Sequence, residues 1–145
     1  MTVSLGILVK KLNNGLQRYA DREAKQLGLT QVQMSIIDFL ARQGTKRPLY
    51  QTDVEHEFNI QKSSATALLQ LMERKELIVR VPSKQDGRYK AIQLTEKSQK
   101  VAAYIRHFFD QNDAFLRNAL GEDAEVVVNA LEKLQTTMAA KLADH

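Results

Sequence analysis

The chain has no cysteine, which excludes disulfide bonds, thiolate metal sites and a cysteine nucleophile. It also has no apolar run approaching the roughly 18 residues that a membrane-spanning helix needs. The apolar residues at the start precede basic ones instead of following them, and no small-residue cleavage site comes after. We therefore expect mature protein rather than a signal peptide, a cytoplasmic location and no membrane partner.

The marks of catalysis are missing as well. The sequence contains no nucleophile–base pair, no glycine loop to hold phosphates and no metal-ligand spacing. His56 stands between Glu55 and Glu57, but adjacent residues on a helix point about 100° apart and rarely ligate one ion together. The sequence predicts no enzyme, no metal site and no cofactor.

What the chain does have is an uneven distribution of charge. Its 145 residues fit one domain, and the net charge of +4 is modest. From residue 62 to 90 there are seven basic residues against three acidic ones, whereas from residue 121 to the end there are two against five. This distribution favours a phosphate-binding face in the middle of the chain. Chance clustering on a solvated surface is the alternative.

The segment from residue 61 to 95 organises the rest of the chain. The apolar residues of its first half have helical spacing: Leu68, Leu69 and Met72. Two runs of strand length follow, at 77–79 and 91–94, and Asp86-Gly87 between them is a strong turn signal. The pattern predicts a helix followed by a basic β-hairpin.

Shorter helices are expected before this segment. A capping box at Thr30–Gln33 begins a helix that Gly44 ends. A second helix is expected over 51–58, with a tight turn at Asn59-Ile60 leading into the helix of the central segment. Two helices joined by such a turn form a helix-turn-helix, and the hairpin makes it a winged one. We expect this winged module over about residues 30–95.

Long helices with apolar stripes are expected at both ends, at about 4–27 and within 96–142. They are longer than the module needs for its own core, so they are interpreted as dimerisation helices. The expected interface residues are Leu5, Leu8, Leu12, Leu116, Val127, Leu131, Leu134 and Met138. The alternative is a monomer in which these helices fold back. The predicted fold class is mainly α with a small β-wing, in a single winged helix-turn-helix domain over residues 1–145.

The wing resembles that of the MarR family of bacterial transcriptional regulators. The resemblance rests on Leu77-Ile78 after the helix, Asp86-Gly87-Arg88 at the turn, and Leu94-Thr95 before the next helix. It implies a homodimer that binds pseudo-palindromic promoter DNA, usually as a repressor. It also implies a small lipophilic or phenolic effector between the dimer helices and the winged module.

The chain departs from the family pattern at several places. Gln61 replaces the usual Ser or Thr at the start of the recognition helix, which predicts a weaker cap. Glu76 stands where a glycine is common after that helix, and Gly87 stands where a second arginine is common. Ala67 and Leu71 occupy positions where many members carry arginine.

The candidate DNA contacts lie on the central helix and the wing: Lys62, Ser63, Ser64, Thr66, Ala67, Gln70, Arg74, Lys84, Asp86, Arg88 and Lys90. Arg88 is expected to enter a minor groove, with Asp86 either orienting it or serving only as a turn-former. Lys84 and Lys90 are expected to contact phosphates. Gln70 has the geometry to read adenine.

Three further assignments leave alternatives open. Ser63 and Ser64 contact DNA, or as small residues they only permit close approach. Arg74 contacts DNA, or it only complements the negative end of its own helix.

Four residues form a candidate effector pocket: Tyr19, Phe39, His107 and Phe108. Aromatic residues at helical spacing are more often part of the core, and that alternative stays open. A competing function is a helical protein-interaction module whose winged domain does not read DNA specifically. Uncharged Ala67 and Leu71 leave room for it, whereas the basic wing favours DNA.

Overall fold

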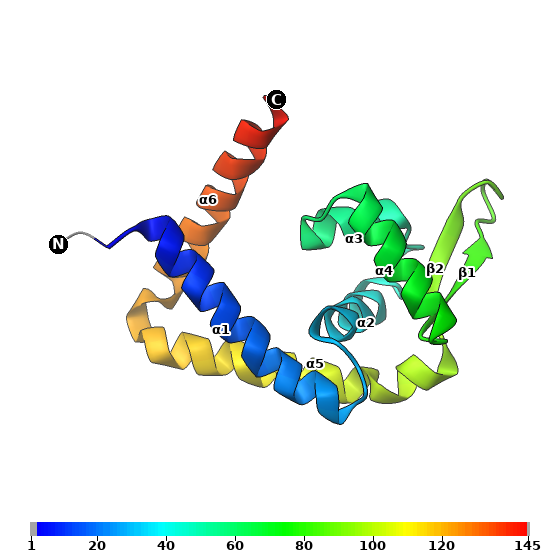
Figure 1. The fold of residues 1–145 in the computed structure, drawn as a ribbon, viewed down its shortest axis with the longest axis horizontal. Helices are drawn as coiled ribbons and strands as arrows, with labels where there is room; N and C mark the ends of the chain where they lie inside the picture. The colour runs from blue at the N-terminus through cyan, green and yellow to red at the C-terminus, as the bar shows by residue number, and fades with distance from the viewer. Residues whose placement is uncertain (1–2, 145) are drawn as a thin grey trace. The chain divides into compact units, whose positions relative to one another are not determined.

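The computed structural model describes residues 3–144, which form helices and one two-stranded antiparallel sheet (Figure 1). The chain divides into two compact units, residues 1–106 and 107–145. The first unit contains α1 (Leu5–Gln26), α2 (Gln31–Gln43), α3 (Gln51–Phe58), α4 (Lys62–Arg74), β1 (Ile78–Pro82), β2 (Lys90–Leu94) and the start of α5 (Glu96–Leu120). The second contains the rest of α5, the 3-10 turn η1 (Gly121–Asp123) and α6 (Ala124–Ala143). Within residues 3–144, no helix is both long and apolar enough to span a bilayer.

The ends of α1 and α2 follow from local chemistry. Gly28 has a left-handed backbone (φ 72°) and closes α1, with the Leu29 amide donating to the Ala24 carbonyl. The predicted capping box of α2 is confirmed: the Gln33 amide donates to Thr30 Oγ1 and the Thr30 amide to Gln33 Oε1. Gly44 ends α2 as predicted but with right-handed backbone. Glycine suits this position because a Cβ there would lie 2.5 Å from the Leu40 carbonyl oxygen.

Helices α3 and α4 form the predicted helix-turn-helix. Asn59 adopts a left-handed conformation (φ 52°), which turns the chain between the two helices, and asparagine tolerates this conformation better than most residues. At the start of α4, Gln61 makes no side-chain cap hydrogen bond, as its residue type predicts. Ala65, Leu69 and Met72 form the buried face of α4. The sequence pattern predicted Leu68 on this face, but Leu68 is only half-buried and Ala65 is buried instead.

The end of α4 has a Schellman motif without glycine. Glu76 has a φ of 61°. Its amide donates to the Glu73 carbonyl and the Leu77 amide donates to the Met72 carbonyl. A glutamate therefore holds the left-handed position at which the family resemblance leads one to expect glycine.

Strands β1 and β2 form the wing, in which Ile78 pairs with Leu94 and Pro82 with Lys90. Both strands extend beyond the apolar runs in the sequence, since Arg80 pairs with Ile92 and Lys90 pairs with Pro82 in the two-stranded sheet. The Ile92 amide donates to the Leu49 carbonyl at 2.7 Å, which attaches the loop before α3 to the free edge of β2.

The core of the first unit lies between α2, α4 and the base of the wing. Its largest fully buried apolar side chains come from these elements, from α3 and the loop before it, and from α5: Met34, Ile36, Ile37, Leu49, Val54, Leu69, Met72, Ile78 and Ile105. The rings of Phe39 and Phe58 meet edge to face with centroids 5.8 Å apart. This contact packs α2 against α3.

In the second unit, Gly121 has a φ of 59° and follows the end of α5, and η1 leads into α6. Arg117 pairs with Asp113 one turn back at 2.9 Å and with Glu125 at 2.9 Å, which ties the end of α5 to the start of α6. Most of the apolar side chains of α6 remain exposed, among them Val126, Leu131, Leu134, Met138 and Leu142.

Candidate nucleic-acid interface

The face of α4 opposite its buried side is accessible. Lys62, Ser63, Ser64, Ala67 and Gln70 are all exposed, so the structure brings these predicted contacts together on one helix surface. Since α4 packs through Ala65, Leu69 and Met72 on its other side, this exposed face is free to lie against a duplex.

Thr66 lies at the edge of this surface and is half-buried. Its hydroxyl donates to the Lys62 carbonyl at 2.9 Å and accepts a hydrogen bond from Gln51 Nε2 at 2.8 Å. Gln51 also donates to the Lys62 carbonyl at 3.4 Å. These bonds hold the start of α3 against the first turn of α4. No local sequence pattern indicates this role of Gln51, because only the fold brings it near Thr66, 15 positions away.

At the wing tip, Asp86 orients Arg88. Arg88 Nη2 lies 2.8 Å from Asp86 Oδ2, and Nε donates to the same carboxylate. The Arg88 amide also donates to Asp86 Oδ1 at 3.0 Å, which closes the turn. Asp86 therefore closes the turn and also pairs with the Arg88 side chain, so it is more than a turn-former. The hydrogen bonds from Arg88 lower the pKa of Asp86, and the same contact raises the pKa of Arg88. The Arg88 side chain remains 85% exposed.

The base of the wing is fixed to α3. Tyr50 donates its hydroxyl hydrogen to Ser83 Oγ at 3.0 Å. The Tyr50 amide donates to Asp53 Oδ2 at 2.8 Å, and Arg47 makes a two-pronged ion pair with the same carboxylate at 2.8 and 3.1 Å. That guanidinium lowers the pKa of Asp53. No short sequence motif reveals this set, because the bond between Tyr50 and Ser83 spans 33 positions.

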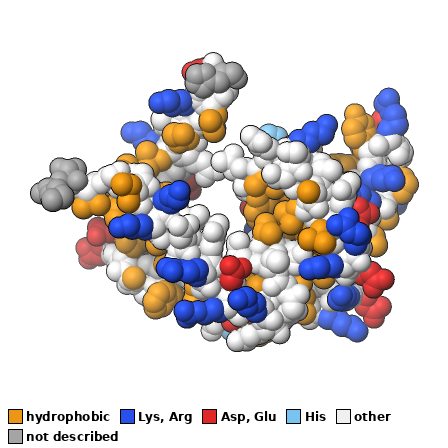
Figure 2. All heavy atoms as spheres, viewed as in Figure 1, with side chains coloured by type: hydrophobic (Ala, Val, Ile, Leu, Met, Phe, Trp, Pro, Cys, Tyr) orange, Lys and Arg blue, Asp and Glu red, His pale blue; other side chains and the backbone are white. Residues whose placement is uncertain are grey.

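The other cations are distributed around the wing. Arg80 lies 3.0 Å from Glu73, which ties β1 to α4. Arg74 is exposed in the last turn of α4, the position where a cation complements the helix dipole. Lysines and arginines gather over the wing and the end of α4 on the face shown in Figure 2.

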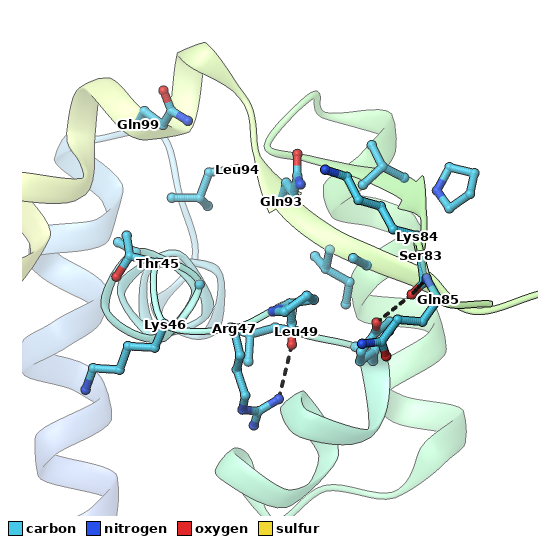
Figure 3. A pocket seen from close by; sticks show the side chains of 18 of the residues that line it. Thr45, Lys46, Arg47, Leu49, Ser83, Lys84, Gln85, Gln93, Leu94 and Gln99 are labelled. Atoms are coloured by element: carbon cyan, nitrogen blue, oxygen red, sulfur yellow. Dashed lines mark hydrogen bonds between the residues drawn. The ribbon is translucent and has the colours of Figure 1, made fainter. Parts of the chain in front are cut away.

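Two hollows flank the base of the wing. The first, here called the cleft, has a volume of about 650 Å³ and includes Arg80, Arg88 and Lys90 together with the start of α3. The second, here called the outer groove, includes Lys84 and not the other three (Figure 3). The structure therefore places Lys90 with Arg88 and separates Lys84 from both.

The four residues of the predicted effector pocket have different surroundings within their own units. In the first unit, Tyr19 is exposed on α1, while Phe39 is buried against Phe58. In the second unit, His107 is exposed, while Phe108 is buried and meets Phe109 with ring centroids 5.4 Å apart. The effector pocket stays a prediction. No group of three or more histidines and carboxylates that could hold a metal is found among residues 3–144.

A helix-turn-helix with an exposed second helix, followed by a basic β-hairpin, defines a winged helix-turn-helix protein. The chain belongs to the MarR family of transcription regulators. The model of the MarR family matches residues 27–88. The transcription regulator MarR from Oenococcus oeni PSU-1 is 38% identical, with 94% of this chain and 99% of that chain covered and a TM-score of 0.84.

Two structures of S. aureus MepR share the fold. The MepR chain of the MepR–DNA complex is 24% identical to this chain, with 93% of this chain and 96% of the MepR chain covered and a TM-score of 0.83. MepR in its DNA-binding conformation is 25% identical to this chain, with 94% of this chain and 99% of the MepR chain covered and a TM-score of 0.82. A comparison with curated proteins finds no match. The residues matched by the family model include Leu77-Ile78 and Asp86-Gly87-Arg88, two of the three motifs on which the sequence resemblance rests, whereas Leu94-Thr95 lies beyond the match. The family expected from these motifs is confirmed.

Proposed function

We propose that the protein is a cytoplasmic, sequence-specific DNA-binding repressor that acts as a homodimer and is released by a small lipophilic or phenolic effector. The observation that carries DNA binding is the ion pair at the wing tip. Asp86 holds the exposed Arg88 guanidinium at 2.8 Å, so little of the arginine's freedom remains to be lost on binding. A narrow A·T-rich minor groove is the site where such a cation is most strongly attracted.

The recognition helix supplies the sequence reading in this proposal. Gln70 is exposed on α4 and has the paired donor and acceptor that adenine requires in the major groove. Lys62 contacts a guanine or a phosphate, and Ser63 and Ser64 lie at the helix start, where backbone amides favour phosphate. Arg74 and Lys90 contact the flanking backbone and set position rather than sequence. Ala67 leaves the middle of the surface flat enough for close approach.

Dimerisation is supported by apolar surface in both units. On α1, Leu5, Leu8 and Leu12 are exposed. On α6, Leu131, Leu134 and Met138 are exposed. Large apolar patches on a soluble domain usually mark an interface. A two-fold dimer presents two recognition helices about one turn of DNA apart, and this spacing matches a pseudo-palindromic operator.

The relatives support the same proposal. The solved relative from Oenococcus oeni is a transcription regulator, and MepR has been solved on DNA with the same fold. The effector part of the proposal rests on the family resemblance. Because the chain has no cysteine, sensing by its own thiols is excluded, which favours a small molecule as the signal.

The test is selection of bound duplexes from a random DNA pool at near-physiological salt. We expect an inverted repeat with half-sites about one helical turn apart and A·T-rich flanks. The affinity of the selected duplex should fall steeply with salt, with a log–log slope of about −0.9 per phosphate neutralised. A pool in which no sequence is enriched would refute specific reading and favour a protein-interaction module.

A further inference from the structure

Two hydroxyl groups connect the end of α4 to the start of α5. The Thr95 hydroxyl donates to the Glu76 carbonyl at 2.7 Å, and the Ser98 hydroxyl donates to the Leu77 carbonyl at 2.7 Å. The two carbonyls follow the recognition helix directly, 19 and 21 positions away from the hydroxyls. These four residues, here called the joint, all belong to the first unit.

The same two hydroxyls also cap α5. Thr95 Oγ1 accepts from the Ser98 amide at 3.2 Å, and Ser98 Oγ accepts from the Thr95 amide at 3.0 Å, in the reciprocal manner of a capping box. A hydroxyl has both a proton to donate and lone pairs that accept. Each side chain can therefore start α5 and hold the end of α4 at the same time, which a carboxylate cannot do.

Few buried side chains attach α5 to the rest of the first unit. Among residues 96–106, all of which the structure describes, only Ser98 and Ile105 are buried. They are seven positions apart and so lie on one face of the helix. Lys97 adds an exposed bond from its Nζ to the Lys75 carbonyl at 3.1 Å. The attachment of α5 thus depends on polar bonds to the end of the recognition helix as well as on apolar packing.

We propose that the joint fixes the direction of α4 relative to α5 and thereby sets the half-site spacing that the protein accepts. This inference rests on the proposed homodimer, in which Leu116 of the same helix α5 lies at the interface. A change of direction at the joint then changes the separation of the two recognition helices. Because half-site spacing follows this separation, a rigid joint selects one spacing. Thr95 and Ser98 are positioning residues, which act through α4 and contact no DNA.

The experiment measures the affinity of the full chain for the selected inverted repeat, for repeats shortened or lengthened by about two base pairs, and for a single half-site. The decisive variant is Thr95→Asp, because aspartate caps a helix at least as well as threonine but has no proton for the Glu76 carbonyl. The preference for the selected spacing should fall about 2- to 10-fold, as for one lost hydrogen bond, while single half-site affinity stays within about twofold. Ser98→Ala should give a similar loss. Thr95→Ser keeps both bonds and should retain the preference.

The matched control is Thr30→Asp, which adds the same charge at the start of α2. Thr30 accepts from the Gln33 amide at 3.2 Å but donates to no carbonyl among residues 3–144, so this variant should keep the spacing preference. A second readout uses no DNA. Residual dipolar couplings from α4 and from residues 96–106 should fit one alignment tensor in the wild type and in Thr30→Asp, whereas Thr95→Asp should need two.

The inference is overturned if Thr95→Asp keeps either the single tensor or the spacing preference of the wild type, or if Thr30→Asp loses that preference equally. A wild-type protein that selects no inverted repeat refutes the proposed function instead, and the couplings alone then decide whether the joint fixes α4. Amide spectra show whether each variant is folded. If Thr95→Asp is not, Ser98→Ala decides by the same two readouts.

Discussion

Tyr50 and Ser83 are joined by a 3.0 Å hydrogen bond between their hydroxyl groups, across 33 positions of sequence. Ser83 Oγ also accepts from the Gln85 amide at 3.3 Å, and the Ser83 amide donates to the Tyr89 carbonyl at 2.8 Å. The start of α3 and the base of the wing are therefore one connected piece. A wing held in this way carries its tip in a fixed direction relative to α4.

Tyr50→Phe removes this bond and should lower the affinity for the selected duplex. A hydrogen bond of this kind contributes about 0.5–1.5 kcal/mol, which corresponds to about a 2- to 10-fold loss. Fluorescence anisotropy with labelled duplex at constant salt measures it. Ser83→Ala should cause a similar loss, and the double variant should be no weaker than the worse single one. Additive losses would show that the two hydroxyls act separately.

Glu76→Gly should stabilise the protein. Glu76 has a φ of 61°, a conformation that costs a residue with a Cβ about 1 kcal/mol relative to glycine. The Thr95 hydroxyl donates to the carbonyl of residue 76 at 2.7 Å, and glycine keeps that carbonyl. Urea unfolding should show an increase of about 1 kcal/mol in the free energy of unfolding, reduced by the greater freedom of glycine in the unfolded chain.

Gly28→Ala provides the matched control with the opposite sign. Gly28 has a φ of 72° at the end of α1, and nothing lies within 4 Å of a Cβ built there. Any loss is therefore due to the backbone alone, and about 1 kcal/mol of destabilisation is expected. If both substitutions shifted stability in the same direction, left-handed strain would not be the cause at Glu76.

The sequence predicted those parts of the fold that depend on local chemistry. The capping box at Thr30 and Gln33 and the turn at Asp86 join residues at most three positions apart, so their side chains reveal them directly. The bond between Tyr50 and Ser83 joins residues that belong to no common motif, and only the folded chain brings them together. The sequence also grouped Lys84 with Lys90. Side chains alternate between the two faces of a sheet only along a strand, and the turn between β1 and β2 separates Lys84 from Lys90. The side of the wing that each lysine faces was therefore not predictable from the sequence.

Arg88→Ala should weaken binding mainly to duplexes with A·T-rich flanks, because minor-groove potential is the source of its attraction. The measured quantity is the ratio of affinities for A·T-flanked and G·C-flanked duplexes with the same core. That ratio should fall toward one, while the core preference set by α4 persists. An equal loss on both duplexes would mean that Arg88 contacts only phosphate.

Asp86→Asn separates the two roles of Asp86. The asparagine oxygen still accepts from the Arg88 amide, so the turn is kept, whereas the ion pair with the guanidinium is lost. Removing a negative charge beside DNA should raise affinity at low salt, yet the freed arginine should discriminate less between the two flanks. A variant that kept full discrimination would show that the pairing does not orient Arg88.

The pH dependence of the wing follows from the same pair. Hydrogen bonds from Arg88 lower the pKa of Asp86 from its ordinary value of 3.8, so the carboxylate of the folded protein is charged at any pH above that value. The ion pair's contribution is fully present above that value and is lost only as pH falls through the lowered pKa. The flank preference should therefore be constant between about pH 5 and 8. A change in that window would have to come from another group.

Gln70→Ala should relax the preference at one base pair in each half-site. A bidentate contact between glutamine and adenine discriminates by about 1–3 kcal/mol. Competition with duplexes substituted at each position locates the base pair concerned. Gln99→Ala, an exposed glutamine on α5, is the control and should leave all preferences unchanged. Preferences that survive Gln70→Ala intact would remove this residue from the reading of DNA.

Leu131→Glu should separate the dimer. Leu131 is exposed in the single chain, so a carboxylate there costs the chain's own core nothing, but it would bury an unpaired charge in an apolar interface. Sedimentation should then give the mass of one 16.5 kDa chain, with helicity unchanged. Lys133→Glu, an exposed neighbour on α6 outside the predicted interface, should remain a dimer.

If Leu131→Glu kept the dimer mass, α6 would not form the interface. If it became a monomer, its affinity for the inverted repeat should fall to that for a single half-site, since the second module is no longer held near its own half-site.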